Sequence, residues 1–298
     1  MKPLLWVLFT IALQTSGALG WAAEAGGVKL VADVPYKVGG QLSDYEKDRC
    51  KLDLYLPEGK KGYPTLVWFH GGGLTGGAKN GKDTVAVVRS LAASGVAVAS
   101  VNYRLSPKAQ YPAYIEDAAA AFAWVKSHIA EQDGDAGRVF VGGHSAGGYL
   151  TFMVGLDERY LRAHGLELTA IAGLVPVSGQ TMTHYTVRQE RGIGKFTITA
   201  DEAAPVFYAR KATPPMLVLY ADQDMAARAE ENAYLVAVIQ ATGNLGCTGL
   251  LVHDRNHGTI ASRMVNADDK ARVAILDFMA DPARYSLAHK PSKVLAQP

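Results

Sequence analysis

The sequence predicts an α/β fold with a mostly parallel central sheet of about eight strands and helices on both faces. Strand-like and helix-like segments alternate along most of the 298 residues, which is the pattern of parallel strands joined by crossover helices. Several of the strand-like segments are continuously apolar, as expected of strands buried on both faces. The composition, 49% hydrophobic and 19% charged, is that of an ordinary globular protein.

Seven segments have the pattern of strands. Residues 49–57 alternate apolar with polar side chains, which indicates a strand with one buried face. Residues 65–70 are apolar up to a terminal histidine, which indicates a central strand. The other five strand-like segments are residues 96–103, 138–143, 168–179, 215–221 and 248–253.

Helical patterns separate these strands. Residues 82–94 form one, which ends at Gly95. Residues 112–132 form a long alanine-rich one that begins with proline, a residue that loses nothing in the first turn of a helix. The remaining helices are expected over residues 146–156, 226–242 and 259–279. In open α/β sheets the ligand lies at the carboxyl ends of the strands, so the residues that follow each strand are the candidates for function.

The chain is predicted to hold one domain, over residues 26–283. No internal repeat, low-complexity linker or change of composition divides it. Residues 180–212 lack a regular pattern and are expected to form a small lid. Residues 284–298 are polar, include a proline and are expected to form a loose C-terminal tail.

Residues 1–23, approximately, have the layout of a secretory signal peptide. One lysine precedes about ten apolar residues, and small residues follow. Because a bilayer span needs roughly 20 apolar residues, we expect cleavage and export to the periplasm or the exterior rather than stable membrane insertion. The alternative is an uncleaved N-terminal anchor.

No nucleic acid, cofactor or metal is expected as a partner. The formal net charge is +2 and no basic run is present. The glycine loop at residues 70–83, "HGGGLTGGAKNGKD", fits a dinucleotide fingerprint, but the next strand ends in "SVNYR" with no carboxylate to hold a ribose. It also approaches a phosphate loop, but Asp83 stands where a serine or threonine should bind magnesium. Oligomeric state is not predicted.

The second glycine loop, "GGHSAGG" at residues 142–148, places Ser145 in a G-x-S-x-G motif between a strand and a helix. A serine in such a sharp turn has a strained backbone and needs neighbours without bulky side chains. Gly143 and Gly147 meet that need and would leave the hydroxyl exposed above the sheet. The alternative is a serine that only caps the helix.

Acyl transfer needs N–H donors for the oxyanion that develops, and two loops offer them. The glycines after His70 can turn the backbone N–H groups of Gly72 and Gly73 toward Ser145, and Ala146 adds another at the start of its helix. His70 is expected to orient this loop rather than to act as the base, because it precedes the nucleophile in the chain.

The acid and the base should follow the serine in that order. Asp222 and Asp224 follow one strand, and His253 and His257 lie at the end of the last one. Position in the loops favours Asp224 and His257. Because a catalytic histidine must be neutral to accept the serine proton, activity should fall below roughly pH 6–7.

At this point the chain resembles the α/β-hydrolase superfamily, specifically the hormone-sensitive-lipase-like and bacterial feruloyl-esterase-like carboxylesterases. The motifs "YLP", "WFHGGG", "VNYRLSP", "GGHSAGG", "LYADQD" and "NHG" occur in that family's order. The resemblance implies Ser145 as nucleophile, His257 as base, Asp224 as acid, and an oxyanion hole from the residues named above.

Some positions depart from the family pattern. Ala221 replaces a usual glycine, Lys108 stands where many members have glutamate, and the N-terminal cap is short, which makes residues 180–212 the expected lid. That segment contains His184, Arg188, Arg191 and Tyr208. The candidates for substrate contact are His70, Leu74, His144 and His184.

The two cysteines are predicted to remain unpaired. In the superfamily, the strand with Cys50 lies near one edge of the sheet and the strand after Cys247 lies at the other. Neighbouring strands are about 4.8 Å apart, so the distance exceeds the roughly 7 Å that a disulfide spans between Cα atoms.

These observations predict an exported serine hydrolase that cleaves modest-sized carboxylic esters through an acyl-enzyme. An acyl-sugar or feruloyl-type esterase and an arylformamidase-like amidase are the nearest alternatives. An alternative of another class is a non-catalytic module that uses the same fold to bind a ligand or partner.

Overall fold

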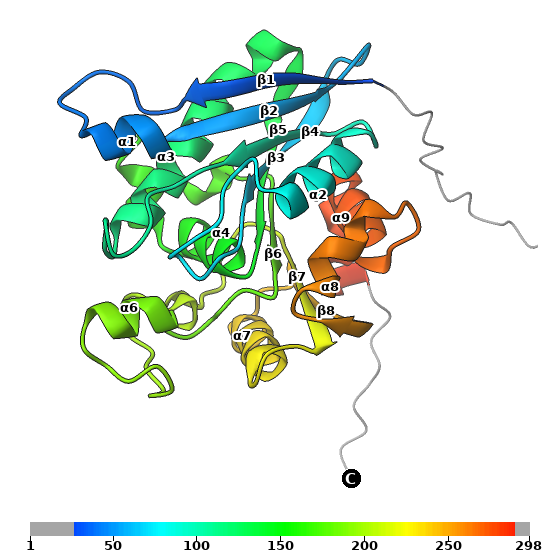
Figure 1. Cartoon of the computed structure of the whole chain (residues 1–298). Helices are drawn as coiled ribbons and strands as arrows, with labels where there is room; N and C mark the ends of the chain where they lie inside the picture. Colours follow the sequence, from blue (N-terminus) through cyan, green and yellow to red (C-terminus); the bar gives the residue numbers. More distant parts are fainter. Residues whose placement is uncertain (1–26, 290–298) are drawn as a thin grey trace, which may run out of the picture.

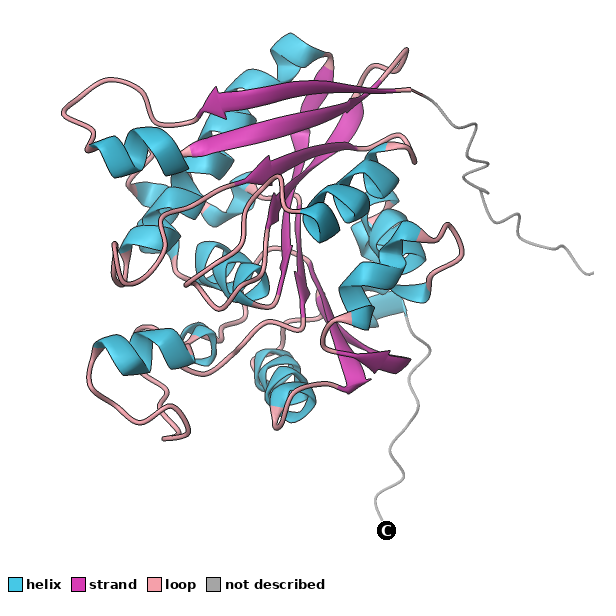
Figure 2. Ribbon diagram, viewed as in Figure 1, coloured by secondary structure: helices cyan, strands magenta, loops and turns pink. Residues whose placement is uncertain are grey.

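A computed structural model describes residues 27–289 and contains one eight-stranded sheet (Figures 1 and 2). The strand order is β1-β2-β4-β3-β5-β6-β7-β8. β1 pairs with β2 and β2 with β4 in antiparallel fashion, and all the other pairs are parallel. The strands are β1 (Val28–Pro35), β2 (Lys51–Pro57), β3 (Tyr63–Phe69), β4 (Ala97–Val101), β5 (Gly134–His144), β6 (Gly173–Val177), β7 (Met216–Gln223) and β8 (Cys247–Asn256).

Helices cover both faces of the sheet, so the predicted fold class is confirmed. The main helices are α2 (Lys82–Ala92), α3 (Ala113–His128), α4 (Ala146–Leu156), α7 (Arg228–Ala241) and α9 (Lys270–Ala280). One apolar core joins the sheet to α3, α4 and α7, and a second joins its other face to α2 and α9. All seven residues of β3 are buried, which explains the continuous apolar run at this position.

The strand missing from the seven sequence patterns is β1, an edge strand. All eight of its residues are exposed or half-buried, so its sequence has no clean alternation. Its register shifts between Val31 and Val34, and Asp33 between them has a φ of +57°. This bulge interrupts the two-residue period on which recognition depends.

Short helices account for other differences from the predicted elements. The structure adds α1 (Asp44–Arg49), α5 (Glu158–Arg162) and, inside the expected lid, α6 (Tyr185–Glu190). The helix expected over residues 259–279 is divided into α8 (Thr259–Ser262), a 3₁₀ turn and α9. Asp269 causes the second start, because its carboxylate caps the N–H groups of Ala271 and Arg272.

The expected loose tail is partly wrong. The ring of Tyr285 packs against Phe278 at a centroid distance of 5.6 Å, its carbonyl accepts a hydrogen bond from Thr248, and Leu287 donates to the carbonyl of Leu245. Residues 284–289 are therefore attached to the domain. The predicted signal peptide at residues 1–23 and the end of the tail lie outside the described residues.

The absence of a disulfide between Cys50 and Cys247 is confirmed. Both thiols are free and buried. Cys50 precedes β2, and Cys247 begins β8, with five strands between these two in the sheet. Within residues 27–289, no helix combines the length and the hydropathy that a membrane span requires.

Candidate active site

Ser145 occupies a strained turn between β5 and α4. Its φ is +59° and its ψ is −116°, a conformation that L-residues avoid unless the surroundings hold it. A Cβ on Gly147 would lie 2.0 Å from the carbonyl oxygen of Phe69, and one on Gly143 would lie 2.6 Å from the backbone of Gly147. Only glycine fits at these two positions, as the sequence predicted.

The structure brings Ser145, His257 and Asp224 together from three loops. The Nε2 atom of His257 lies 2.8 Å from the Ser145 hydroxyl oxygen, and its Nδ1 atom lies 2.6 Å from a carboxylate oxygen of Asp224. Because that carboxylate accepts the Nδ1–H, Nε2 remains free to accept the serine proton. This chain of hydrogen bonds can raise the nucleophilicity of the hydroxyl toward a carbonyl carbon.

The Asp224 carboxylate is buried but well solvated by protein donors. Burial tends to raise its pKa, but hydrogen bonds from His257 and from the Ser178 hydroxyl outweigh this and hold the pKa below its ordinary value. The Ser178 oxygen lies 2.5 Å from it, and the Met225 N–H donates to it at 2.7 Å. Asp224 therefore stays charged beside the imidazole.

The competing residues Asp222 and His253 form a separate pair. The Nδ1 atom of His253 lies 3.4 Å from a carboxylate oxygen of Asp222, and the ring of His253 is mostly exposed. Asp222 accepts hydrogen bonds from the N–H groups of Asp254 and Arg255, which hold its pKa below its ordinary value. The structure thus separates two aspartates that the sequence placed in one loop.

The glycine loop that holds two of the proposed oxyanion donors lies next to the serine. A Cβ on Gly71 would lie 3.3 Å from the Cβ of Ser145, so the glycine loop contacts the nucleophile directly. Within the described part of the chain, the N–H groups of Gly72, Gly73 and Ala146 donate to no acceptor. Three such donors beside a serine can stabilise a negative oxygen.

His70 contacts the backbone of the glycine loop that follows it, which fits the orienting role expected of it. Its Nδ1–H donates to the carbonyl of Gly71 at 2.7 Å, and its ring stacks on Tyr103. Burial lowers its pKa to about 4, so the ring is neutral. Its Nε2 then accepts from Arg49 at 3.5 Å.

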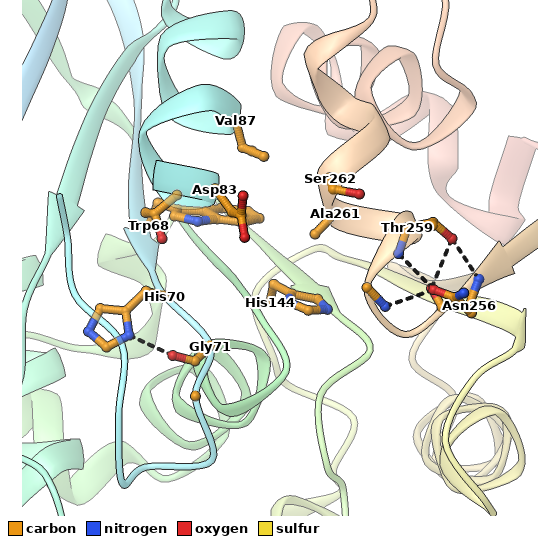
Figure 3. Close-up of a pocket in the computed structure, with 13 residues that line it drawn as sticks. Trp68, His70, Gly71, Asp83, Val87, His144, Asn256, Thr259, Ala261 and Ser262 are labelled. Carbon is orange, nitrogen blue, oxygen red and sulfur yellow. Dashed lines mark hydrogen bonds between the residues drawn. The ribbon is translucent and has the colours of Figure 1, made fainter. Parts of the chain in front are cut away.

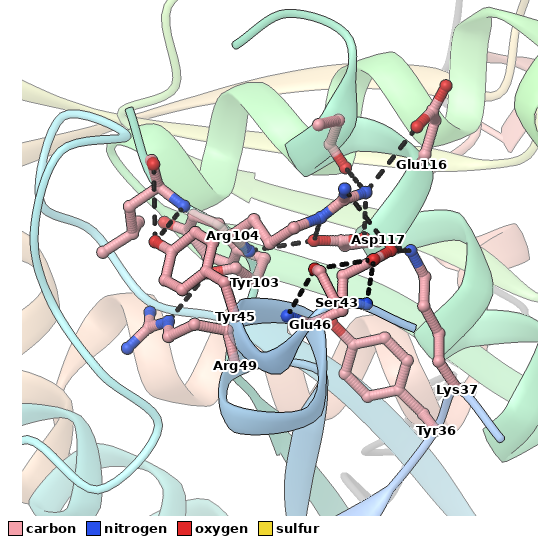
Figure 4. Close-up of polar contacts among 12 residues, drawn as sticks. Tyr36, Lys37, Ser43, Tyr45, Glu46, Arg49, Tyr103, Arg104, Glu116 and Asp117 are labelled. Atoms are coloured by element: carbon pink, nitrogen blue, oxygen red, sulfur yellow. Dashed lines mark hydrogen bonds and ion pairs between the residues drawn. The ribbon is translucent and has the colours of Figure 1, made fainter. Parts of the chain in front are cut away.

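Arg49 belongs to a polar network that joins α1 to the segment after β4 (Figure 4). Its Nε donates to the carbonyl of Tyr103. Arg104, which follows Tyr103 in the chain, pairs with the fully buried carboxylate of Asp117 at 2.8 Å. Lys37 donates to the same carboxylate. The "VNYR" motif thus anchors the loop that His70 supports.

The structure corrects two predicted substrate contacts. Leu74, within the glycine loop, is fully buried and packs in the apolar core. His184 is also buried, and its Nδ1 accepts from the N–H of Thr186 as the N-cap of α6. Burial lowers the pKa of His184 well below its ordinary value. Neither side chain faces solvent.

His144, Gly71 and Gly72 line a cavity of about 610 Å³ between α2 and α8 (Figure 3). His144 donates from Nε2 to the carbonyl of His257, and burial together with the neighbouring His257 ring lowers its pKa to about 4. Since His70 is also neutral, Asp83 is the one charged side chain in this wall. The lining residues are Trp68, His70, Gly71, Gly72, Asp83, Thr84, Val87, His144, Asn256, Gly258, Thr259, Ala261 and Ser262.

The lid expected over residues 180–212 is not confirmed; the segment contains α6 and a 3₁₀ turn (Pro205–Tyr208). Arg188 donates to the carbonyls of Lys195 and Thr197, which shapes the segment itself. Arg191 pairs with Asp201 at 2.6 Å. Across residues 27–289, no three His, Cys, Asp or Glu side chains gather as a metal site would require.

Sequence reasoning missed three residues next to the site. Ser178 donates to Asp224, while Tyr185 and Thr186 contact the loop at Gly73. All three come from segments far from the motifs they touch, so no local pattern announces them. A non-glycine φ of +49° at Ser178 is visible only in three dimensions.

The strand order, the serine elbow and the loop positions define an α/β-hydrolase fold. The BD-FAE family model matches residues 52–238, and the chain belongs to that family. The carboxylesterase NlhH of Mycobacterium tuberculosis is 34% identical over 143 residues, which are 48% of this chain and 40% of NlhH. The carboxylic ester hydrolase LipN of the same organism is 43% identical over 101 residues, or 34% of this chain and 27% of LipN.

The chain therefore spans less than half the length of these two curated relatives. Among solved structures, a truncated carbohydrate esterase from gut microbiota is similar, with a TM-score of 0.69 and 22% identity. The match covers 88% of this chain and 99% of that one. At this level of identity, the likeness supports the fold.

Proposed function

We propose that the chain is a serine carboxylesterase that works through an acyl-enzyme. The main support is the unbroken chain of hydrogen bonds from the Ser145 hydroxyl through His257 to Asp224. The names of the relatives, carboxylesterase and carboxylic ester hydrolase, agree with this chemistry. A non-catalytic binding module would need no such chain.

In the proposed reaction, the Ser145 oxygen attacks the ester carbonyl carbon while its proton passes to Nε2 of His257. The N–H groups of Gly72, Gly73 and Ala146 stabilise the oxyanion of the tetrahedral intermediate. The imidazolium then gives its proton to the departing alcohol, and Asp224 stabilises its charge. Water activated by His257 releases the acid in the second half of the reaction.

The proposed substrates are esters of modest size. The cavity of about 610 Å³ is lined by Gly71, His144 and Gly258, which are neighbours of the triad residues and not the triad itself, and its volume suits a small or medium ligand. Its wall combines the Trp68 ring with hydroxyl, amide and carboxylate groups, which favours a hydroxylated alcohol group as a second candidate. The carbohydrate esterase among the similar structures points in the same direction. No contact in the site specifically favours an amide.

Export remains part of the proposal. It rests on the lysine, apolar run and small residues at the N-terminus. Amino-terminal sequencing of the mature protein tests it: cleavage after Gly20, Ala22 or Ala25 is expected, and a retained N-terminus in the cytoplasm would contradict export.

A panel of p-nitrophenyl esters from acetate to palmitate tests the activity and the size limit. We expect the highest kcat/KM at short acyl chains and loss of almost all turnover in Ser145→Ala. Ser127→Ala, on the exposed face of α3, is the matched control and should behave as wild type. A maximum at palmitate would refute the size limit, and full turnover by Ser145→Ala would refute the mechanism.

A further inference from the structure

The loop at residues 71–74, the oxyanion loop of the proposed mechanism, has a conformation that it cannot hold by itself. Three consecutive residues have positive φ angles: Gly72 at +119°, Gly73 at +63° and Leu74 at +63°. Glycine accepts such angles readily, but leucine does not, because its Cβ approaches the backbone. Contacts from elsewhere must therefore hold the peptide between Gly73 and Leu74.

Two hydrogen bonds fix that part of the loop. The Thr186 hydroxyl donates to the Gly73 carbonyl at 2.5 Å, and the Ser106 N–H donates to the Leu74 carbonyl at 2.8 Å. Thr186 is 2% exposed, so water cannot easily replace its hydroxyl. The Gly73 carbonyl belongs to the peptide that joins Gly73 to Leu74, so this bond sets the orientation of that peptide.

Thr186 itself is firmly placed at the start of α6. Its N–H donates to Nδ1 of His184, whose ring lies between those of Tyr149 and Tyr185. Tyr185 presses on the same glycine, because a Cβ on Gly73 would lie 2.0 Å from its hydroxyl oxygen. The start of α6 thus holds Gly73 at two points.

We propose that Thr186 is a positioning residue for the oxyanion hole, and this inference rests on the proposed function. Without the bond from Thr186 to its carbonyl, Gly73 could shift within the loop, and its N–H would move relative to the nucleophile. The Thr186 hydroxyl prevents this shift. Thr186 thereby acts on the chemical step through its bond to Gly73.

The test compares kcat and KM for a p-nitrophenyl ester in Thr186→Val, Thr186→Ser and wild type. Valine keeps the shape but removes the donor, so we expect kcat to fall about 10- to 100-fold, less than the 10²–10³-fold loss of a donor itself. KM should change less than about threefold, since ground-state binding does not use the oxyanion hole. Serine should restore kcat to within about threefold of wild type.

Thr183→Val is the matched control. Thr183 is equally buried in the same segment, but its hydroxyl donates to Asp201 and does not reach the loop. Its kcat should stay within about twofold of wild type. Labelling with a fluorophosphonate to completion counts the competent serines in each sample, so partial misfolding does not mimic a lower kcat. If Thr186→Val does not fold, Thr186→Ala against Thr186→Ser makes the same comparison.

The outcomes separate the two proposals. A wild-type protein without turnover or labelling would overturn the proposed function. If the wild type is active, two results would overturn the positioning role alone. One is a kcat of Thr186→Val (or Thr186→Ala) within threefold of wild type. The other is a loss of kcat in Thr186→Ser as large as in that variant. An equal loss in Thr183→Val would assign the effect to general loosening of the segment and would also overturn it.

Discussion

Two histidine–aspartate pairs join the ends of the same two strands, but only one is built to move a proton. In the inner pair, His257 lies 2.6 Å from Asp224, and their side chains are 22% and 0% exposed. In the outer pair, His253 lies 3.4 Å from Asp222, and the exposures are 67% and 24%. The two aspartates are two residues apart at the end of β7, and the two histidines are four residues apart at the end of β8.

The difference lies in what else each pair contacts. Nε2 of His257 reaches the Ser145 hydroxyl, and Ser178 donates to its aspartate. The ring of His253 has no such second partner in the region that the structure describes, and its aspartate serves the backbone N–H groups of Asp254 and Arg255. A histidine–aspartate contact therefore indicates catalysis only when a nucleophile completes it and solvent is excluded.

Removal of the histidines should separate the pairs most sharply. We expect His257→Ala to lower kcat/KM by about 10³-fold or more, because the general base is lost. His253→Ala should remain within about twofold of wild type. Steady-state hydrolysis of p-nitrophenyl acetate measures both, and equal losses in the two variants would break the comparison.

The aspartates should differ in the same direction. Asp224→Asn should lower kcat by about 10²–10⁴-fold, because the ring then loses its charged partner and its tautomer is no longer fixed. Asp222→Asn should lower the Tm by weakening the turn at Asp254 and Arg255, with a much smaller effect on kcat. If Asp222→Asn lost as much kcat as Asp224→Asn, the assignment of Asp224 as the catalytic acid would be wrong.

Buried and exposed histidines should differ in how pH affects stability. Burial lowers the pKa of His70 and His144 to about 4, and it lowers that of His184 well below its ordinary value. Their unfolded forms take up protons near pH 6.5 while the folded forms do not, so the free energy of unfolding should fall as pH drops from about 6.5 toward 4. Each such histidine contributes up to about 1.4 kcal/mol per pH unit.

Urea unfolding at several pH values measures this slope. His184→Asn keeps an N-cap on α6 and should reduce the slope by about one proton. A flat profile between pH 6.5 and 4.5 in wild type would show that the buried rings accept protons in the folded state.

The smallest expected effect tests the additional donor of the inner pair. Ser178→Ala removes one hydrogen bond to the Asp224 carboxylate, while His257 and the Met225 N–H still hold it. We expect kcat to fall about three- to tenfold, in line with the loss of one bond to a charged group. Activity equal to wild type would mean that Ser178 adds nothing to the placement of Asp224.

Much of the site was predictable because parallel strands end at one edge of the sheet. That rule brings Ser145 after β5, the two aspartates at the end of β7 and the two histidines at the end of β8 to the same edge. Position in the loops favoured Asp224 over Asp222, and the structure shows a register shift between Ala221 and Gln223, immediately before Asp224. Local sequence does not report such a shift.

No sequence pattern could predict the contacts that hold the oxyanion loop in place. Thr186 and Gly73 are 113 residues apart, and neither has a periodic or motif signal for the other. Leu74 and His184 were assigned to the substrate from their neighbourhood in the chain, and burial in the fold gives them packing and capping roles. The edge strand β1 escaped for a related reason, since it buries too little to show alternation.

One rapid-quench measurement examines Ser145 most directly. The wild-type protein is mixed with p-nitrophenyl acetate, quenched in acid within the first turnover and mapped by peptide mass spectrometry. We predict a burst of about one nitrophenolate per chain, with one acetyl group on Ser145. An acetyl group on another residue, or a burst of the same size from Ser145→Ala, would contradict the account.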